Sequence, residues 1–148
     1  NTAWVFATLE MRTPPLLSAI AVAAIRRIGE FRSQDFGNTA WAFAKLQFAD
    51  PPLLDAMSAA AMPRLHEFPP QNVANLAWAL AKLQCRDPPL LEAIAGAAMA
   101  KIEDLNAQDL SNIVWAVATL GWRDDPLIES IAAASMRKLP HGRPQDFA

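Results

Sequence analysis

Hydrophobic and polar residues along this chain follow the three- to four-residue spacing of an α-helix, and no segment keeps the strict alternation of a β-strand. In the stretch SQDFGNTAWAFAKL, the apolar residues Phe36, Ala40, Phe43 and Ala44 fall on one side of a helix. The pattern therefore predicts a helix over residues 33–47, and equivalent helices wherever the same stretch returns.

A second helix is expected directly after each of these stretches. The segments TPPLL, DPPLL and DDPLI each place a capping Thr or Asp just before Pro, which is a strong signal for a helix start. Asn106 is a natural cap for one of the first helices, and Pro70 stands where a first helical residue is expected in another. The second helices are rich in Ala and apolar on most sides, so they should be buried. Pro63 lies inside one of them and should kink or shorten it.

The Asn-x-x-Trp pattern returns every 37 residues, at Asn1, Asn38, Asn75 and Asn112, and a Gln follows the same spacing. A period between about 20 and 50 residues is typical of stacked repeats. We therefore predict an all-α fold, an α-solenoid of stacked antiparallel helix pairs forming a superhelix. We also expect the chain to be part of a longer array. The expected repeats are residues 1–37, 38–74, 75–111 and 112–148.

The composition argues against membrane insertion and against an internal disulfide. Hydrophobic residues make up 53% of the chain and charged residues 19%, yet no apolar stretch reaches the roughly 20 residues that span a bilayer, so no membrane insertion is expected. Cys85 is the only cysteine, which excludes an internal disulfide. Met11, Phe48 and Trp122 occupy the equivalent position in the other repeats, so we interpret Cys85 as an apolar filler.

Residues that usually carry catalysis are scattered. His66 and His141 occupy unmatched positions, and neither belongs to a cluster with metal-ligand spacing. The sequence has no Gly-rich loop for a phosphate group. We therefore expect no enzymatic activity, no metal, no cofactor and no small-molecule substrate.

The repeated Asn marks the best candidate for an open, ligand-facing ridge on the first helix of each pair. The helical neighbours of Asn38 are Asp35, Ala42 and Lys45, so this row is polar with a small residue in its middle. Two interpretations are open: the Asn amides bridge adjacent helices, or they reach RNA. The candidate contacts are Asn38, Asn75 and Asn112 with the variable neighbours Asp35, Asn72, Asp109, Thr8, Lys45, Lys82 and Thr119.

Two other repeated residue types have a structural interpretation. Each repeated Trp has an Ala three residues later, as Trp41 and Ala44 do, which favours packing between repeats over a stacking platform for a nucleobase. A basic residue recurs near the end of each second helix, where it stabilises the negative end of the helix dipole. These residues are Arg27, Arg64, Lys101 and Lys138.

The net charge of −2 lacks the strongly basic character that phosphate neutralisation favours. The distribution of charges along the chain weakens this argument against RNA binding, because many acidic residues lie at the starts of the second helices and in turns. Basic residues gather instead at the end of the ridge and add to the RNA-binding candidates. They are Arg12, Lys45, Lys82, Arg86 and Arg123.

The segments SQDFGNTAWAFAKL, PQNVANLAWALAKL and AQDLSNIVWAVATL, each followed by a Pro-started second helix, resemble the octotricopeptide repeat family along the whole chain. The resemblance implies a single-stranded RNA partner and a role in the stability, processing or translation of RNA in a chloroplast or mitochondrion. The alternative is a protein–protein interaction scaffold without nucleic-acid contact, which near-neutral charge favours. An exposed apolar patch on the ridge would also favour the scaffold.

Overall fold

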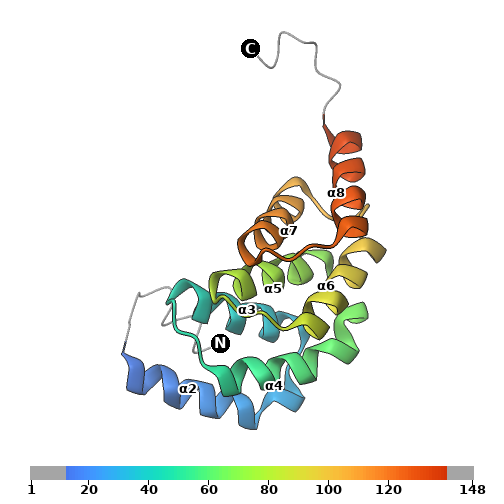
Figure 1. The fold of residues 1–148 in the computed structure, drawn as a ribbon. Coiled ribbons are helices and arrows are strands. Elements are labelled where there is room, and N and C mark those ends of the chain that lie inside the picture. Colours follow the sequence, from blue (N-terminus) through green and yellow to red (C-terminus); the bar gives the residue numbers. More distant parts are fainter. Residues whose placement is uncertain (1–12, 140–148) are drawn as a thin grey trace.

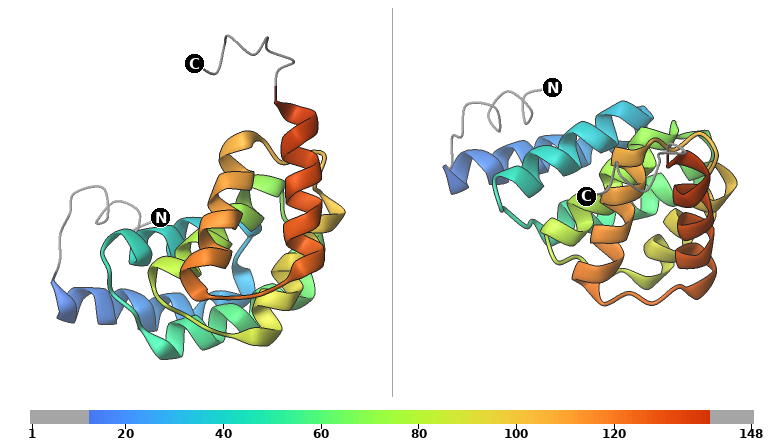
Figure 2. Two further views of the ribbon diagram at one scale, coloured as in Figure 1. Left: turned by 45° about the horizontal axis from the view of Figure 1, so that its top comes forward. Right: turned by 90° about the horizontal axis from the view of Figure 1, so that it is seen from above.

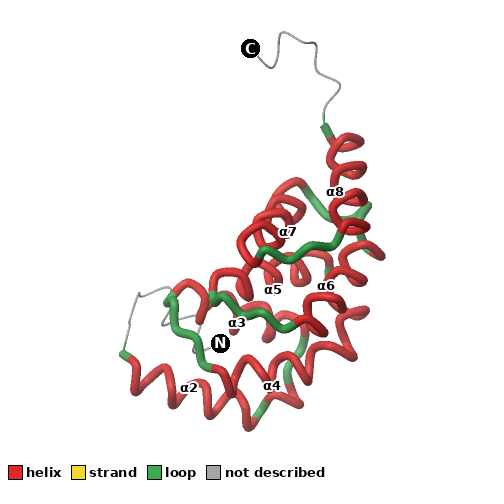
Figure 3. The backbone as a smooth tube through the Cα atoms, in the orientation of Figure 1, coloured by secondary structure: helices red, strands yellow, loops and turns green. Residues whose placement is uncertain are grey.

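A computed structural model describes residues 13–139, and within this range the chain consists of helices joined by loops, without a β-strand (Figures 1 and 3). The all-α prediction is therefore confirmed. The first helices of the pairs, called A helices below, are α3 (Ser33–Lys45), α5 (Pro70–Lys82) and α7 (Ala107–Leu120). The second, or B, helices are α2 (Pro14–Arg26), α4 (Pro51–Ala61), α6 (Pro88–Ala100) and α8 (Asp125–Lys138).

The helices form two layers. Helix α3 packs against α5 and α5 against α7, and these are the most extensive contacts between elements. Helix α2 packs against α4, and α6 packs against α8. Figures 1 and 2 show α3, α5 and α7 following one another in one layer, with the B helices along its other side. The division into four complete repeats and the superhelical course stay predictions, because the structure describes residues 13–139.

Each B helix starts as its Pro-containing segment predicts. Asp50, Asp87 and Asp124 stand at the N-cap positions, and their carboxylates accept main-chain hydrogen bonds at 2.9, 3.1 and 2.9 Å. Thr13 has the N-cap position of α2, but its side chain makes no capping bond. The effect expected of Pro63 is confirmed, because α4 ends at Ala61 and a short 3-10 helix, η2 (Met62–Glu67), follows.

Helices α3 and α5 end two residues earlier than predicted, and α7 ends one residue earlier. Gln47, Gln84 and Gly121 take the left-handed conformation, with φ of 54°, 55° and 58°, immediately after the last turn. The following residue then bonds back into the helix, as Cys85 N does to the carbonyl oxygen of Leu80 at 2.9 Å. This is a Schellman ending, in which the returning residue is commonly apolar. Cys85 is partly buried against the core at this position, which agrees with its interpretation as an apolar filler.

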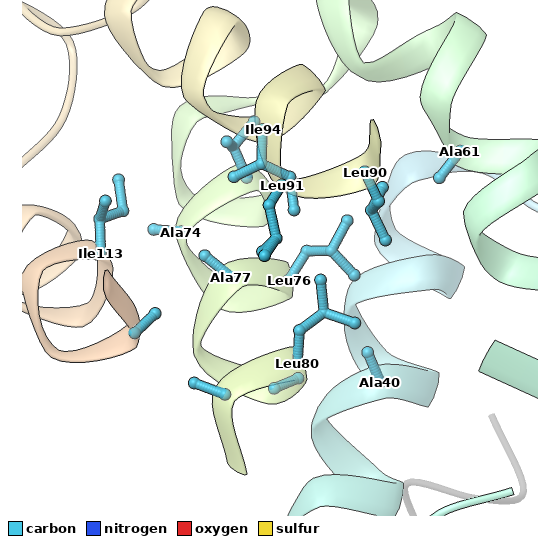
Figure 4. Close-up of a cluster of buried hydrophobic side chains, with 14 of the residues drawn as sticks. Ala40, Ala61, Ala74, Leu76, Ala77, Leu80, Leu90, Leu91, Ile94 and Ile113 are labelled. Atoms are coloured by element: carbon cyan, nitrogen blue, oxygen red, sulfur yellow. The ribbon is translucent and has the colours of Figure 1, made fainter. Parts of the chain in front are cut away.

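Small residues let the A helices approach closely. Ala77 and Ala81 of α5 are completely buried, and Leu76 and Leu80 fill the space between α3, α5 and the B layer. Figure 4 shows Leu76 and Ala77 of α5 beside Leu90 and Leu91 of α6, with Leu80 nearer Ala40 of α3. The core is thus shared between neighbouring pairs. Helix α5 has two sides covered by α3 and α7, one covered by the B layer and one open, whereas α3 and α7 each pack against α5 alone among the described A helices.

Candidate nucleic-acid interface

The open side of each A helix carries the same series of side chains. In α5 these are Gln71, Asn75, Trp78 and Lys82, whose spacing of four, three and four residues places them on one helix side. Gln71 and Lys82 are exposed, whereas Asn75 and Trp78 are half-buried. We call the combined surface the A-helix stripe. Its members are Gln34, Asn38, Trp41 and Lys45 of α3, Gln71, Asn75, Trp78 and Lys82 of α5, and Gln108, Asn112, Trp115 and Thr119 of α7.

Side-chain contacts link neighbouring members of the A-helix stripe. Gln108 donates a hydrogen bond from Nε2 to Oδ1 of Asn112 at 3.0 Å. The Lys45 ammonium lies over the Trp41 ring, 5.0 Å from its centroid. The stripe therefore presents amides at one end of each helix and, on α3 and α5, an indole with an ammonium group at the other.

Side chains of the A-helix stripe also connect α5 to α7. The ring centroids of Trp78 and Trp115 are 6.4 Å apart, with the ring planes tilted by 36°. Lys82 Nζ lies 6.0 Å from each of the two ring centroids. A single ammonium group thus bridges the indoles of two adjacent A helices, at a distance where cation–π attraction acts.

Among residues 13–139, Lys45, Lys82 and Arg86 pair with no carboxylate. Several other cations do, for example Arg27 with Glu30 at 3.0 Å. Positive charge on this surface is therefore available to an external anion.

The repeated cations at the ends of the B helices have a role that the sequence interpretation missed. Arg64 donates to the carbonyl oxygen of Phe31, Lys101 to that of His66 and Lys138 to that of Glu103, at 2.8, 2.8 and 2.7 Å. Each acceptor lies in the preceding helix pair. Their regular recurrence along the sequence was the signal for such a contact.

Several predicted RNA contacts do lie on the A-helix stripe. Asn38, Asn75, Asn112, Lys45 and Lys82 are members, and Thr119 takes the lysine position in α7. Arg86 and Arg123 are exposed in the loops after their A helices, and Arg123 Nε lies 3.4 Å from Asp125 Oδ1. Thr8 and Arg12 lie outside the described residues.

The predicted acidic and small members of the ridge lie elsewhere. Asp109 is only 4% exposed and accepts a hydrogen bond from the main-chain N–H of Asn106. Asp35 accepts from the main-chain N–H of Arg32 at 2.9 Å. The side chain of Asn72 faces Gly37 of α3, between two A helices. Ala42, Ala79 and Ala116 are likewise buried, so the row drawn through them was wrong.

In the A-helix stripe, Gln and Trp stand where the sequence analysis had expected the acidic residues and Ala. The signal for Gln was its fixed spacing, which matches that of Asn. The packing interpretation of Trp agrees with Trp41 and Trp78, which lie partly buried against the core. The same side chains also reach the surface, and Trp115 is 40% exposed.

An apolar groove of about 540 Å³ lies between α7 and α8. Leu110, Val114 and Trp115 line it from α7, and Leu139 from the end of α8. Val114 is 49% exposed, whereas its equivalent on α5, Ala77, is completely buried beneath α7. The groove is therefore the uncovered counterpart of a surface that another A helix covers elsewhere in the structure.

The described residues offer little reactive chemistry. Residues 13–139 hold no group of three or more His, Cys, Asp or Glu side chains arranged to bind a metal ion. Burial raises the pKa of the Cys85 thiol, and the Asp87 and Asp55 carboxylates raise it further, so the thiol is held in its protonated form. No helix in the described range is long and apolar enough to cross a membrane.

Taken together, the two helix layers and the A-helix stripe are those of a helical protein built from similar helix pairs. The chain belongs to the RNA-editing substrate-binding complex 6 protein family, whose model matches residues 6–138. No curated protein matches the chain. The family match agrees with the coarser expectation of a helical, RNA-related protein, and the likeness to octotricopeptide repeats stays a resemblance.

Proposed function

We propose that this chain is a non-catalytic component of RNA metabolism that binds single-stranded RNA through the A-helix stripe. The name of its family refers to an RNA-editing substrate-binding complex, which supports an RNA or protein partner from such an assembly. The organellar location and the array of four repeats belong to the same proposal, and both rest on the repeat pattern and the resemblance described above.

The observation that carries the proposal is the coincidence of three properties on one surface. The ammonium groups of Lys45 and Lys82 have no carboxylate partner among residues 13–139, and they lie over the half-buried indoles of Trp41 and Trp78. Repeated amides extend along the same side of each helix. Cations and amides supply the phosphate and hydrogen-bonding contacts of single-stranded RNA recognition, and the aromatic rings hold the cations in place.

Net charge is a weak objection to this assignment. The negative charges of Asp50, Asp87 and Asp124 are placed at the starts of B helices, where each carboxylate caps main-chain N–H groups. Exposed charges more than about 8–10 Å apart are largely screened at ordinary ionic strength. Lys45 and Lys82 pair with none of these carboxylates, so their charge is available to a phosphate bound beside them.

The test is binding of the folded chain to a pool of short single-stranded RNAs at low and at moderate salt. The variant K45E/K82E reverses the stripe lysines, and R26E/R27E makes the same charge change at the end of α2. The proposal expects salt-sensitive binding that K45E/K82E abolishes and R26E/R27E retains. Equal loss in both variants would show an effect of net charge alone, and the absence of binding at low salt by the folded chain would contradict the proposal.

A second candidate is a protein–protein scaffold, and the groove between α7 and α8 favours it. Exposed apolar grooves of this kind mark surfaces for partner helices. This candidate becomes the preferred one if the folded chain fails to bind RNA.

A further inference from the structure

The ammonium groups of the A-helix stripe are positioned rather than freely extended. Lys45 Nζ lies 5.0 Å from the Trp41 ring centroid, and Lys82 Nζ lies 6.0 Å from the centroids of both Trp78 and Trp115. A lysine side chain normally loses considerable rotamer freedom when its head is fixed. Here the indole faces supply part of that ordering before any ligand is bound.

The ligand that suits such a group is an anion with exposed oxygen atoms. Lysine recognises phosphate as a compact point charge with several N–H donors. An ammonium group already placed over the ring faces repels a cationic peptide and offers no favourable contact to an apolar one. Because the ammonium covers these faces, a nucleobase does not stack on them without displacing it.

The two lysines also occupy the same register on adjacent helices. Lys45 and Lys82 are 37 residues apart, and α3 packs directly against α5. Axes of packed helices are about 8–10 Å apart, so the two ammonium groups follow the direction in which the helix pairs stack. The third position of the series is Thr119, which brings no charge.

We propose that Lys45 on Trp41, and Lys82 on the Trp78–Trp115 pair, form a phosphate track that binds one phosphate of single-stranded RNA per repeat and is interrupted at Thr119. This inference rests on the proposed function and names the part of the RNA that these residues contact. Phosphate contacts carry no sequence information. Recognition of bases is consequently left to the amides at the other end of the A-helix stripe.

The test is the salt dependence of binding to a short oligouridylate. Each phosphate contact to a single strand contributes about 0.7 to the slope of log K against log salt. K45Q and K82Q should each reduce the magnitude of the slope by about 0.7, and T119K should increase it by a similar amount. The control R26Q removes a charge at the end of α2 and should leave the slope unchanged. Circular dichroism and thermal unfolding establish that each variant is folded.

A second arm separates phosphate from base contacts. A ribose-phosphate strand of the same length without bases should show the same response to K45Q and K82Q. Loss of its binding, or slopes that K45Q and K82Q leave unchanged while oligouridylate still binds, would overturn the phosphate track and leave the proposed function standing. An unchanged slope in T119K would overturn the rule of one phosphate per repeat. Failure of the unaltered chain to bind oligouridylate and the RNA pool alike would instead defeat the proposed function.

Discussion

Arg64 donates a hydrogen bond from its guanidinium to the main-chain carbonyl oxygen of Phe31, 2.8 Å away, although the two residues are 33 positions apart in the chain. Lys101 and Lys138 make corresponding bonds to carbonyl oxygens of the helix pair before their own. The α4–η2 segment and helices α6 and α8 are therefore each tied to the preceding helix pair by a charged donor, in addition to the apolar packing of the A layer.

The Arg64 contact leads to a stability prediction. R64M should lower the free energy of unfolding by about 1–2 kcal/mol, because a hydrogen bond from a charged group is lost and a carbonyl oxygen is left without its partner. R27M should change it by less than about 0.5 kcal/mol, because Arg27 is exposed and pairs only with the neighbouring Glu30. Urea unfolding measures both, and equal effects would show that the bond between the helix pairs contributes nothing.

Asp87 should be more important to the fold than the other B-helix caps. Its carboxylate accepts from Leu90 N and also from the hydroxyl of Ser58 at 2.6 Å, whereas Asp124 caps α8 through Leu127 N. D124A should destabilise the chain by about 1 kcal/mol and D87A by about 2 kcal/mol, since Ser58 is buried and loses its acceptor. Thermal unfolding of the two variants under one condition tests the difference. A D87A effect no larger than that of D124A would contradict it.

Gly37 offers a stabilising substitution despite its burial. A Cβ atom added there would lie 3.8 Å from Asn72 Oδ1, which is an ordinary van der Waals contact. Because Gly is about 0.5–1 kcal/mol less favourable than Ala inside a helix, G37A should raise the melting temperature. G96A is the matched control, since its Cβ would meet no atom within 4 Å. Stabilisation by G96A together with destabilisation by G37A would show that α3 and α5 pack more tightly than the structure indicates.

The Cys85 thiol should make stability depend on alkaline pH. Burial, followed by Asp87 and Asp55, raises its pKa above the ordinary value of 9.0. Below that value both folded and unfolded chains keep the proton, and the contribution of the thiol is fully present. As the pH rises through the raised pKa, the unfolded chain has already lost the proton and the contribution disappears. The midpoint of urea unfolding should thus fall more steeply with alkaline pH in the unaltered chain than in C85A. Identical profiles would contradict the assignment.

Local patterns predicted most of the helices, because their signals lie within a few residues of each other. The Pro-started B helices and the interruption at Pro63 follow from backbone geometry alone. The ends of the A helices were harder to predict from the sequence, since Gln47 and Gln84 take the left-handed conformation that Gly more readily adopts. Gly121, at the equivalent position, is the residue type that such an ending favours.

The open side of the A helices was harder to predict than the helices themselves. Because Trp78 was assigned to the core, the exposed ridge was predicted to run through Ala79, which is buried in the structure. An indole has both an apolar body and a polar edge, so its residue type does not decide whether it faces the core or the surface. That choice depends on where the neighbouring A helix packs, and this contact joins residues 37 positions apart.

Cross-linking of the folded chain to a short single-stranded RNA carrying 4-thiouridine tests the central claim most directly. Mass spectrometry of the cross-linked peptides should identify the segments of α3 and α5 that carry Trp41 with Lys45 and Trp78 with Lys82. Cross-links confined to the B helices α4, α6 and α8 would contradict an RNA-binding A-helix stripe.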